Sequence, residues 1–137
     1  MIPIVCVDDG WGMAFHGRRQ SMDRAVRASI LAEAAGAGLW MNGYSIRQFD
    51  PAETGAITLA EDFLDRAGEG AYCFVEDRPL LPWLDRMEGL VLYRWNRRYP
   101  ADVFLDLRPE PPAWRLVCRE DFAGRSHPRI TKEVYQR

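Results

Sequence analysis

Short apolar runs alternate with polar, glycine-containing segments along most of the chain. Five of these runs have the length and β-branched or aromatic content typical of strands. They cover residues 2–7, 39–41, 71–75, 89–93 and 114–119. The segment 130–135 fits either a last strand or a short helix. A polar loop is expected from the turn signal Asp8-Asp9-Gly10 through Gln20.

Helical spacing first occurs after this loop, where Val26, Ile30 and Ala34 recur every four residues. Ser21 is a suitable N-cap, Asp23 would lie in the positive first turn, and 36–38 (Gly-Ala-Gly) would end the helix. The pattern therefore predicts an amphipathic helix after residue 21.

Three further helices are predicted between the strands. A short one covers 45–49, and a second covers 58–67, with Thr58 as N-cap and Glu61 completing a capping box. A third is opened by Pro79, with apolar residues at helical spacing up to Met87.

Strands that alternate with helices favour an α/β fold. We expect a three-layer sandwich with a mixed, mostly parallel central sheet, and an antiparallel edge where two late strands follow each other without a helix. A chain of 137 residues encloses one core and buries about two thirds of its unfolded surface. Residues 1–137 are thus predicted to form a single domain.

Composition adds constraints on compartment and partners. The formal net charge is −2, which argues against a generally basic nucleic-acid binder, although Lys132 is the only lysine among 18 basic residues. Cys6, Cys73 and Cys118 lie in apolar runs without CxxC spacing, so neither a disulfide framework nor a zinc site is indicated. With no apolar stretch of about 20 residues and no signal-peptide pattern, a cytoplasmic protein without membrane contact is expected.

The order of several motifs resembles dihydrofolate reductase. "IVCVDDGWGM" resembles the first strand and the Met-containing loop of that family, ending at Met13, and "QSMDRAV" places Asp23 at the start of the next helix. Later motifs follow in the same order: "LWMNGYSIRQF", "AYCFVEDRPLLPWL", "LVLYRWNRRYPADVFL", and the terminal pair "WRLVCRED" and "RITKEVYQR". The resemblance implies a dihydrofolate reductase-like fold with Asp23 as the active-site carboxylate.

The same resemblance gives a negative expectation for the cofactor. Members of this family leave the cofactor strand through paired glycines, which let the dinucleotide pyrophosphate approach the backbone. Glu76 and Asp77 stand at those positions, and the phosphate-binding turn after the second strand has no arginine. Canonical NADPH binding is therefore not expected, and the cofactor stays unknown.

Charged residues follow two of the predicted strands directly. If the family strand order holds, Asp8, Asp9, Glu76 and Asp77 meet at the carboxyl edge of the sheet, where open α/β sheets bind ligands. Such a cluster needs cations. Candidates are Mg²⁺, an amine ligand, and the nearby arginines Arg18, Arg19, Arg24 and Arg78. Alternatively, the first pair caps a turn and the second pair forms salt bridges.

Asp23 has two interpretations. It could relay a proton or anchor an amidine-like ring, because a carboxylate matches an N–C–N donor pair. It could equally stabilise the helix dipole.

The leading hypothesis is a divergent reductase-like domain that binds a small polar or heteroaromatic ligand, with a cleft at the carboxyl ends of the central strands. Asp23 is the predicted catalytic residue. The predicted ligand contacts are Asp8, Asp9, Met13, Arg18, Arg19, Ser45, Glu76, Asp77, Arg78 and Tyr93. One alternative is a reductase with an altered cofactor mode. Another is a nucleotide or RNA phosphate site, which requires Arg18, Arg19, Arg97 and Arg98 to converge.

Overall fold

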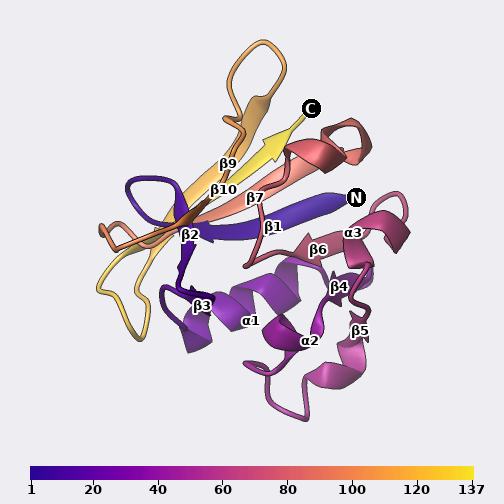
Figure 1. The fold of residues 1–137 in the computed structure, drawn as a ribbon, viewed down its shortest axis with the longest axis horizontal. Helices are drawn as coiled ribbons and strands as arrows, with labels where there is room; N and C mark the ends of the chain where they lie inside the picture. Colours follow the sequence, from indigo (N-terminus) through magenta and orange to yellow (C-terminus); the bar gives the residue numbers. More distant parts are fainter.

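The computed structural model describes residues 1–137, and its centre is a seven-stranded mixed sheet (Figure 1). In spatial order the strands are β5 (Ile57–Leu59), β4 (Leu39–Met41), β6 (Tyr72–Phe74), β1 (Ile2–Val7), β7 (Gly89–Arg94), β10 (Ile130–Gln136) and β9 (Arg115–Phe122). The first five run parallel to one another, and β10 runs antiparallel to both β7 and β9. The predicted α/β class, the mixed sheet and the antiparallel C-terminal edge are confirmed.

The strands predicted to be central lie side by side. Ile2 of β1 is level with Tyr72 of β6, and Ile4 is level with both Phe74 and Val91 of β7. Successive side chains of a strand point to opposite faces. Ile4 accordingly packs in one apolar cluster, with Val26 and Ile30, while Val5 packs in a second, with Phe63 and Leu80. The sheet is therefore covered by an apolar layer on each face.

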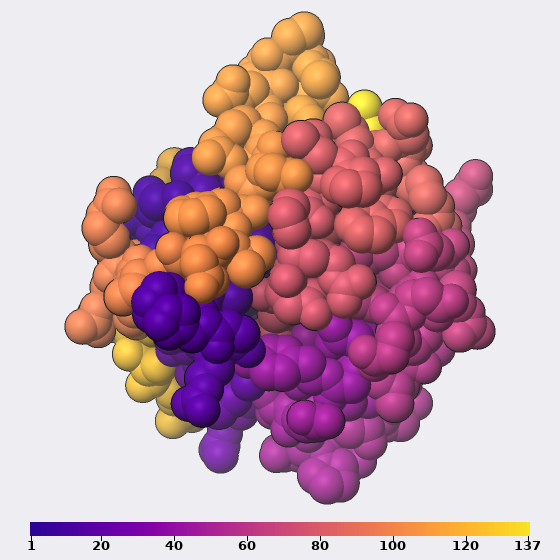
Figure 2. Space-filling model, in the orientation of Figure 1, coloured from indigo at the N-terminus to yellow at the C-terminus, as the bar shows by residue number.

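A second, three-stranded antiparallel sheet replaces the polar loop predicted before Gln20. It consists of β3 (Arg18–Arg19), β2 (Gly12–Phe15) and β8 (Val103–Phe104). His16 and Gly17 link β2 to β3 with φ values of 50° and 72°, which is the backbone conformation of a tight hairpin turn. Figure 2 shows the indigo N-terminal segment packed against the orange segment that carries β8.

The first helix is α1 (Arg24–Glu33), and it begins later than predicted. Its N-cap is Asp23, not Ser21, because the Asp23 carboxylate accepts the backbone N–H groups of Ala25 and Val26. The next helix, α2 (Gly43–Ile46), is also displaced from the predicted 45–49. Here the Asn42 side chain accepts the backbone N–H of Ser45 and sets the start of the helix.

The helix predicted over 58–67 is wrong for its first half. A 3₁₀ turn, η1 (Thr54–Ala56), leads into β5, which takes its backbone pairing from β4 in parallel register. Only α3 (Phe63–Arg66) is helical. Pairing with a neighbouring strand thus overrides the local capping-box signal.

The helix predicted after Pro79 is the 3₁₀ helix η2 (Leu81–Arg86). Pro82 stands at the start of this helix, where backbone N–H groups have no acceptor within the helix and proline is tolerated. The backbone N–H groups of Leu80 and Leu81 instead donate to Asp106 Oδ1, at 2.7 and 3.0 Å. No helix of the chain is both long and apolar enough to cross a membrane.

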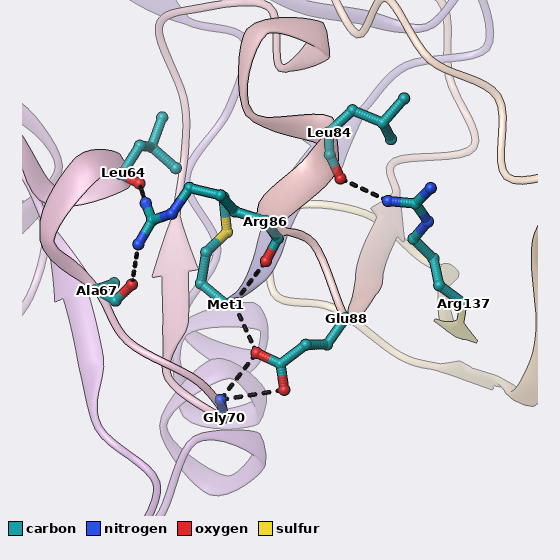
Figure 3. A network of polar contacts seen from close by, with 8 residues as sticks. All are labelled: Met1, Leu64, Ala67, Gly70, Leu84, Arg86, Glu88 and Arg137. Carbon is teal, nitrogen blue, oxygen red and sulfur yellow. Dashed lines mark hydrogen bonds and ion pairs between the residues drawn. The ribbon is translucent and has the colours of Figure 1, made fainter.

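The start of the chain is held by a polar network (Figure 3). The Met1 ammonium donates to the Arg86 carbonyl at 2.9 Å and to Glu88 Oε2 at 2.6 Å. Glu88 also accepts the Gly70 N–H at 2.9 Å. These hydrogen bonds, together with the positive charge of the amino group, lower the pKa of Glu88. The network ties the start of β1 to the segments before β6 and β7.

Candidate functional site

Asp8 organises the loops at the carboxyl end of β1. Its Oδ1 accepts the N–H groups of Gly10 and Gly12, at 2.8 and 2.7 Å. Its Oδ2 accepts from Gln20 Nε2 at 3.2 Å and from the Tyr99 N–H at 3.0 Å. The carboxylate is buried and fully used by the chain's own donors. Its neighbour Asp9 is exposed and has no side-chain partner.

Glu76, at the exit of β6, pairs with Arg19 from β3. The guanidinium is bidentate, with Nε 2.8 Å from Oε2 and Nη2 3.1 Å from Oε1. Arg19 also lies over the Tyr44 ring, with Cζ 4.3 Å from the ring centroid, and donates to the Tyr44 carbonyl at 3.3 Å. Burial opposes the charge of Arg19, but the hydrogen bonds and charge of Glu76 outweigh it and raise the pKa of Arg19.

Asp77 belongs to a separate network. It accepts two hydrogen bonds from its neighbour Arg78, at 2.9 and 3.1 Å, and one from Asn42 Nδ2 at 3.0 Å. Glu76 and Asp77 therefore each have an arginine partner, whereas Asp8 is satisfied by amides. Nowhere in the chain are three or more Asp, Glu, His or Cys side chains arranged to hold a metal ion.

Ser45 is a buried residue at this edge of the sheet whose hydroxyl group is unpaired. Its Oγ has no hydrogen-bond partner although the residue is only 1% exposed. Gln20 Oε1 is likewise buried without a donor. Buried polar atoms are normally paired, so both atoms are unused hydrogen-bonding capacity beside the β1, β4 and β6 exits.

Asp23 is buried at the start of α1 and is saturated with donors. Oδ1 accepts from Ala25 and Val26, and Oδ2 accepts the Arg125 N–H at 2.7 Å, the Ser126 N–H at 2.6 Å and the Ser126 hydroxyl at 2.7 Å. Burial opposes ionisation, but these hydrogen bonds, led by those of Ser126, lower its pKa. In this arrangement the carboxylate caps the helix and anchors the 124–127 loop.

The Asp23 network continues to two residues that the sequence did not single out as a site. Ser126 Oγ lies 2.6 Å from His127 Nδ1, and His127 Nε2 lies 2.6 Å from the Tyr99 hydroxyl. Because the serine proton points to Asp23, the consistent direction is Tyr99 to His127 to Ser126 to Asp23. His127 also stacks on Trp95, with ring centroids 4.8 Å apart. No spacing pattern in the sequence predicts this hydrogen-bonded network, because Ser126 is 103 residues from Asp23.

Arginines gather in a hollow beside the start of α1. The hollow has a volume of about 560 Å³ and is lined by Met22, Asp23, Arg24, Arg27, Arg125 and Ser126. We call it the arginine hollow. A smaller hollow of about 230 Å³ is lined by Phe15, Arg18, Arg19, Gln20, Tyr99 and Pro100. The hydrogen-bonded chain from Tyr99 to Asp23 therefore runs from one hollow to the other.

The remaining predicted contacts are dispersed. Met13 is a core residue, and Tyr93 is fully buried in the other apolar layer, with its hydroxyl 2.7 Å from Ser29 Oγ. Burial raises the pKa of Tyr93. Arg18 and Arg19 line the smaller hollow, whereas Arg97 and Arg98 are exposed and line neither. The four arginines of the phosphate alternative are thus not gathered in one hollow.

Neither a protein-family model nor a curated protein matches this sequence. Its function is therefore inferred from its own residues and their arrangement.

Proposed function

We propose that the chain is a divergent dihydrofolate reductase-like domain that binds a small polar or heteroaromatic ligand in the arginine hollow. Three features support the resemblance. The strand ending at Val7 lies beside the one that leads to Val75, Asp23 stands at the start of the first helix after the Met13 loop, and an antiparallel terminal pair closes the sheet.

The observation that carries the proposal is the arginine hollow itself. Its volume of about 560 Å³ falls within the range of small-molecule sites. It lies at the carboxyl edge of the sheet, where α/β domains bind ligands. Five of its six lining residues are polar or charged. Guanidinium planes both donate hydrogen bonds and stack on flat rings, so this lining suits a polar heteroaromatic molecule.

A dinucleotide is not the expected ligand. Glu76 and Asp77 put two carboxylates at the exit of β6, and Arg19 already covers Glu76 and the Tyr44 ring. A pyrophosphate would have to displace these contacts and approach the carboxylates. NADPH titration followed by nicotinamide fluorescence is expected to show no binding, and a micromolar dissociation constant would contradict this part of the proposal.

The binding site is tested by filling the hollow without changing its charge. Met22 lines the hollow and is 51% exposed, so Met22→Trp should leave the fold intact while occupying the space. Leu81→Trp is the matched control, because Leu81 is 47% exposed and lies in η2, away from the hollow. Both variants and the parent chain are compared in a thermal-shift panel of folates, nucleotides, sugar phosphates, free sugars and polyamines.

A ligand at 100 times its dissociation constant adds about 2.7 kcal/mol of stability. We expect one class of the panel to stabilise the parent chain and the Leu81→Trp control but not Met22→Trp. A ligand that stabilises all three proteins equally binds elsewhere, and a panel in which no compound stabilises the parent chain overturns the proposal.

A further inference from the structure

We infer that the arginine hollow is specific for a small phosphate monoester, with Arg24, Arg27 and Arg125 holding the phosphate group. The inference rests on the proposed function, since it names the ligand class of the same site. It concerns residues that the resemblance to dihydrofolate reductase does not single out as binding residues.

The first argument is that these arginines have no partners. Arg19, Arg78 and Arg94 each pair with a carboxylate at 2.9 Å or less. The side chains of the three arginines in the hollow form neither an ion pair nor a hydrogen bond. Like charges placed together repel one another, and a bound anion would remove that cost.

The second argument concerns the carboxylate in the hollow. Asp23 keeps its negative charge, but both of its oxygens accept hydrogen bonds from the backbone and from Ser126, so it forms no direct ion pair with an arginine of the hollow. The hollow therefore presents guanidinium donors and no free acceptor of comparable strength. This donor set matches an acceptor-only ligand group such as a phosphate.

The third argument is the position of two of the arginines on α1. Arg24 and Arg27 occupy the first turn, which contains no acidic residue. The N-terminal end of a helix carries partial positive charge, which the Asp23 N-cap complements but which arginines in the first turn oppose. Residues three apart lie on the same face of a helix. Two positive charges therefore stand at an unfavourable position at the start of α1, and such local violations are common in binding sites.

Arg125 reaches the same spot from the opposite end of the chain. Its backbone N–H donates to Asp23 Oδ2 at 2.7 Å, which fixes the loop against the start of α1. Gly124 makes this approach possible, because a Cβ there would lie 2.7 Å from the same oxygen. Asp23 is in this view a positioning residue for the third arginine.

The size and lining of the hollow favour a small ester over a nucleic acid. Single-stranded nucleic acids are bound along extended basic grooves with aromatic platforms for the bases. Here the only apolar lining residue is Met22, and no aromatic side chain is present. Three guanidinium groups around one open surface hollow suit a single dianion.

The experiment compares the parent chain with Arg27→Gln and with Arg47→Gln as matched control. Arg47 is an exposed arginine at the end of α2 with no ion pair, so both changes remove one surface-accessible charge. Binding of inorganic phosphate, ribose 5-phosphate, free ribose and a short single-stranded RNA is measured by calorimetry at low and physiological salt. Thermal unfolding without ligand checks that each variant folds.

We expect ribose 5-phosphate and inorganic phosphate to bind the parent chain, with affinity falling at higher salt. Arg27→Gln should weaken binding of both at least tenfold, and Arg47→Gln should leave it unchanged. Equal binding by the two variants overturns the inference, as does RNA that binds more tightly than the sugar phosphate. If free ribose binds as tightly as ribose 5-phosphate, the phosphate assignment is wrong. The proposed binding site still stands in that case, provided that Met22→Trp abolishes ribose binding. Failure of every compound in the wider panel overturns the proposed function as well.

Discussion

At the exit of β6, the carboxylates of Glu76 and Asp77 are each held by an arginine at 2.8–2.9 Å, whereas none of the arginines of the arginine hollow forms an ion pair with a carboxylate. Both regions lie at the carboxyl edge of the same sheet. In the first, the charges satisfy one another and stabilise the loops. In the second, the only carboxylate is committed to the backbone. A charged edge can thus contain a structural part and a part left open for a ligand.

The largest effect is expected from Asp23, which lines the arginine hollow. Asp23→Ala removes the N-cap of α1 and leaves the donors of Arg125 and Ser126 unpaired. N-cap loss costs about 1 kcal/mol and each hydrogen bond to a charged group about 1.5–3 kcal/mol, so loss of the cap and of the loop hydrogen bonds should lower the free energy of unfolding by about 4 kcal/mol or more. Urea denaturation measures it.

The control for this change is Asp9→Ala. Asp9 is exposed and without a side-chain partner, so its replacement should change the free energy of unfolding by less than about 0.5 kcal/mol. If the Asp23 variant were as stable as the control, the carboxylate would not be the structural anchor described above.

Glu76→Gln tests whether the ion pair at the exit of β6 is independent of ligand binding in the arginine hollow. The side chain of Glu76 is 7% exposed and that of Arg19 is 18% exposed, so the pair is largely shielded from water. Loss of the bidentate contact should lower the free energy of unfolding by about 2 kcal/mol while phosphate binding in the arginine hollow stays unchanged. Arg27→Gln should leave the free energy of unfolding nearly unchanged and weaken phosphate binding. Chemical denaturation measures the stability of both variants, and calorimetry measures their phosphate binding. Loss of phosphate binding in the Glu76 variant would place the site at β6 instead.

A smaller, pH-dependent effect should come from His127. Burial lowers its pKa, an effect that Arg97 reinforces and the negative charge of Asp23 opposes. The unfolded chain therefore takes up the histidine proton first, so stability should fall as the pH drops below about 6.5. His127→Gln should flatten stability measured by denaturation between pH 7 and 5. The lowered pKa of Asp23 adds a further loss at more acidic pH, and an unchanged slope in the variant would argue against the histidine as its source.

The smallest effect is expected at the Met1 network. Glu88→Gln removes an ion pair to the amino terminus, but the Glu88 side chain is 42% exposed. Such pairs contribute at most about 1 kcal/mol. Calorimetric melting of the variant should show a small decrease that is largely absent at high salt, and a large loss would mean that the hydrogen bonds to Gly70 and Arg86 depend on the charge.

Part of this structure follows from local sequence. The residues of β1, β6 and β7 are almost all apolar, so these strands can be buried on both faces. That pattern predicts their place at the centre of the sheet. The region around Thr58 has a good local helix signal, yet its backbone pairs with β4. The hairpin at His16 and Gly17 is not predicted because its strands are only four and two residues long, too short to show an alternating pattern.

The candidate site was less predictable than the sheet. The sequence points to Asp23 and Glu76 because each follows a structural boundary, and Arg19 is among the cations that it offers for Glu76, whereas the partners of Asp23 are not predicted. Ser126, His127 and Arg125 reach Asp23 only through the turn between β9 and β10, about a hundred residues later. Their convergence depends on the packed sheet, and no spacing pattern in one sequence records it.

The Asp23 anchor has a consequence for the order of events during synthesis. Oδ1 finds its donors within three residues, so α1 can be capped as soon as it leaves the ribosome. Oδ2 lacks its donors until Arg125 and Ser126 are made, 102 and 103 residues after Asp23. Until then a carboxylate oxygen that the finished fold buries has no donor. The helix α1 therefore reaches its final state only when the β9–β10 hairpin docks, which couples two segments about a hundred residues apart in one folding step.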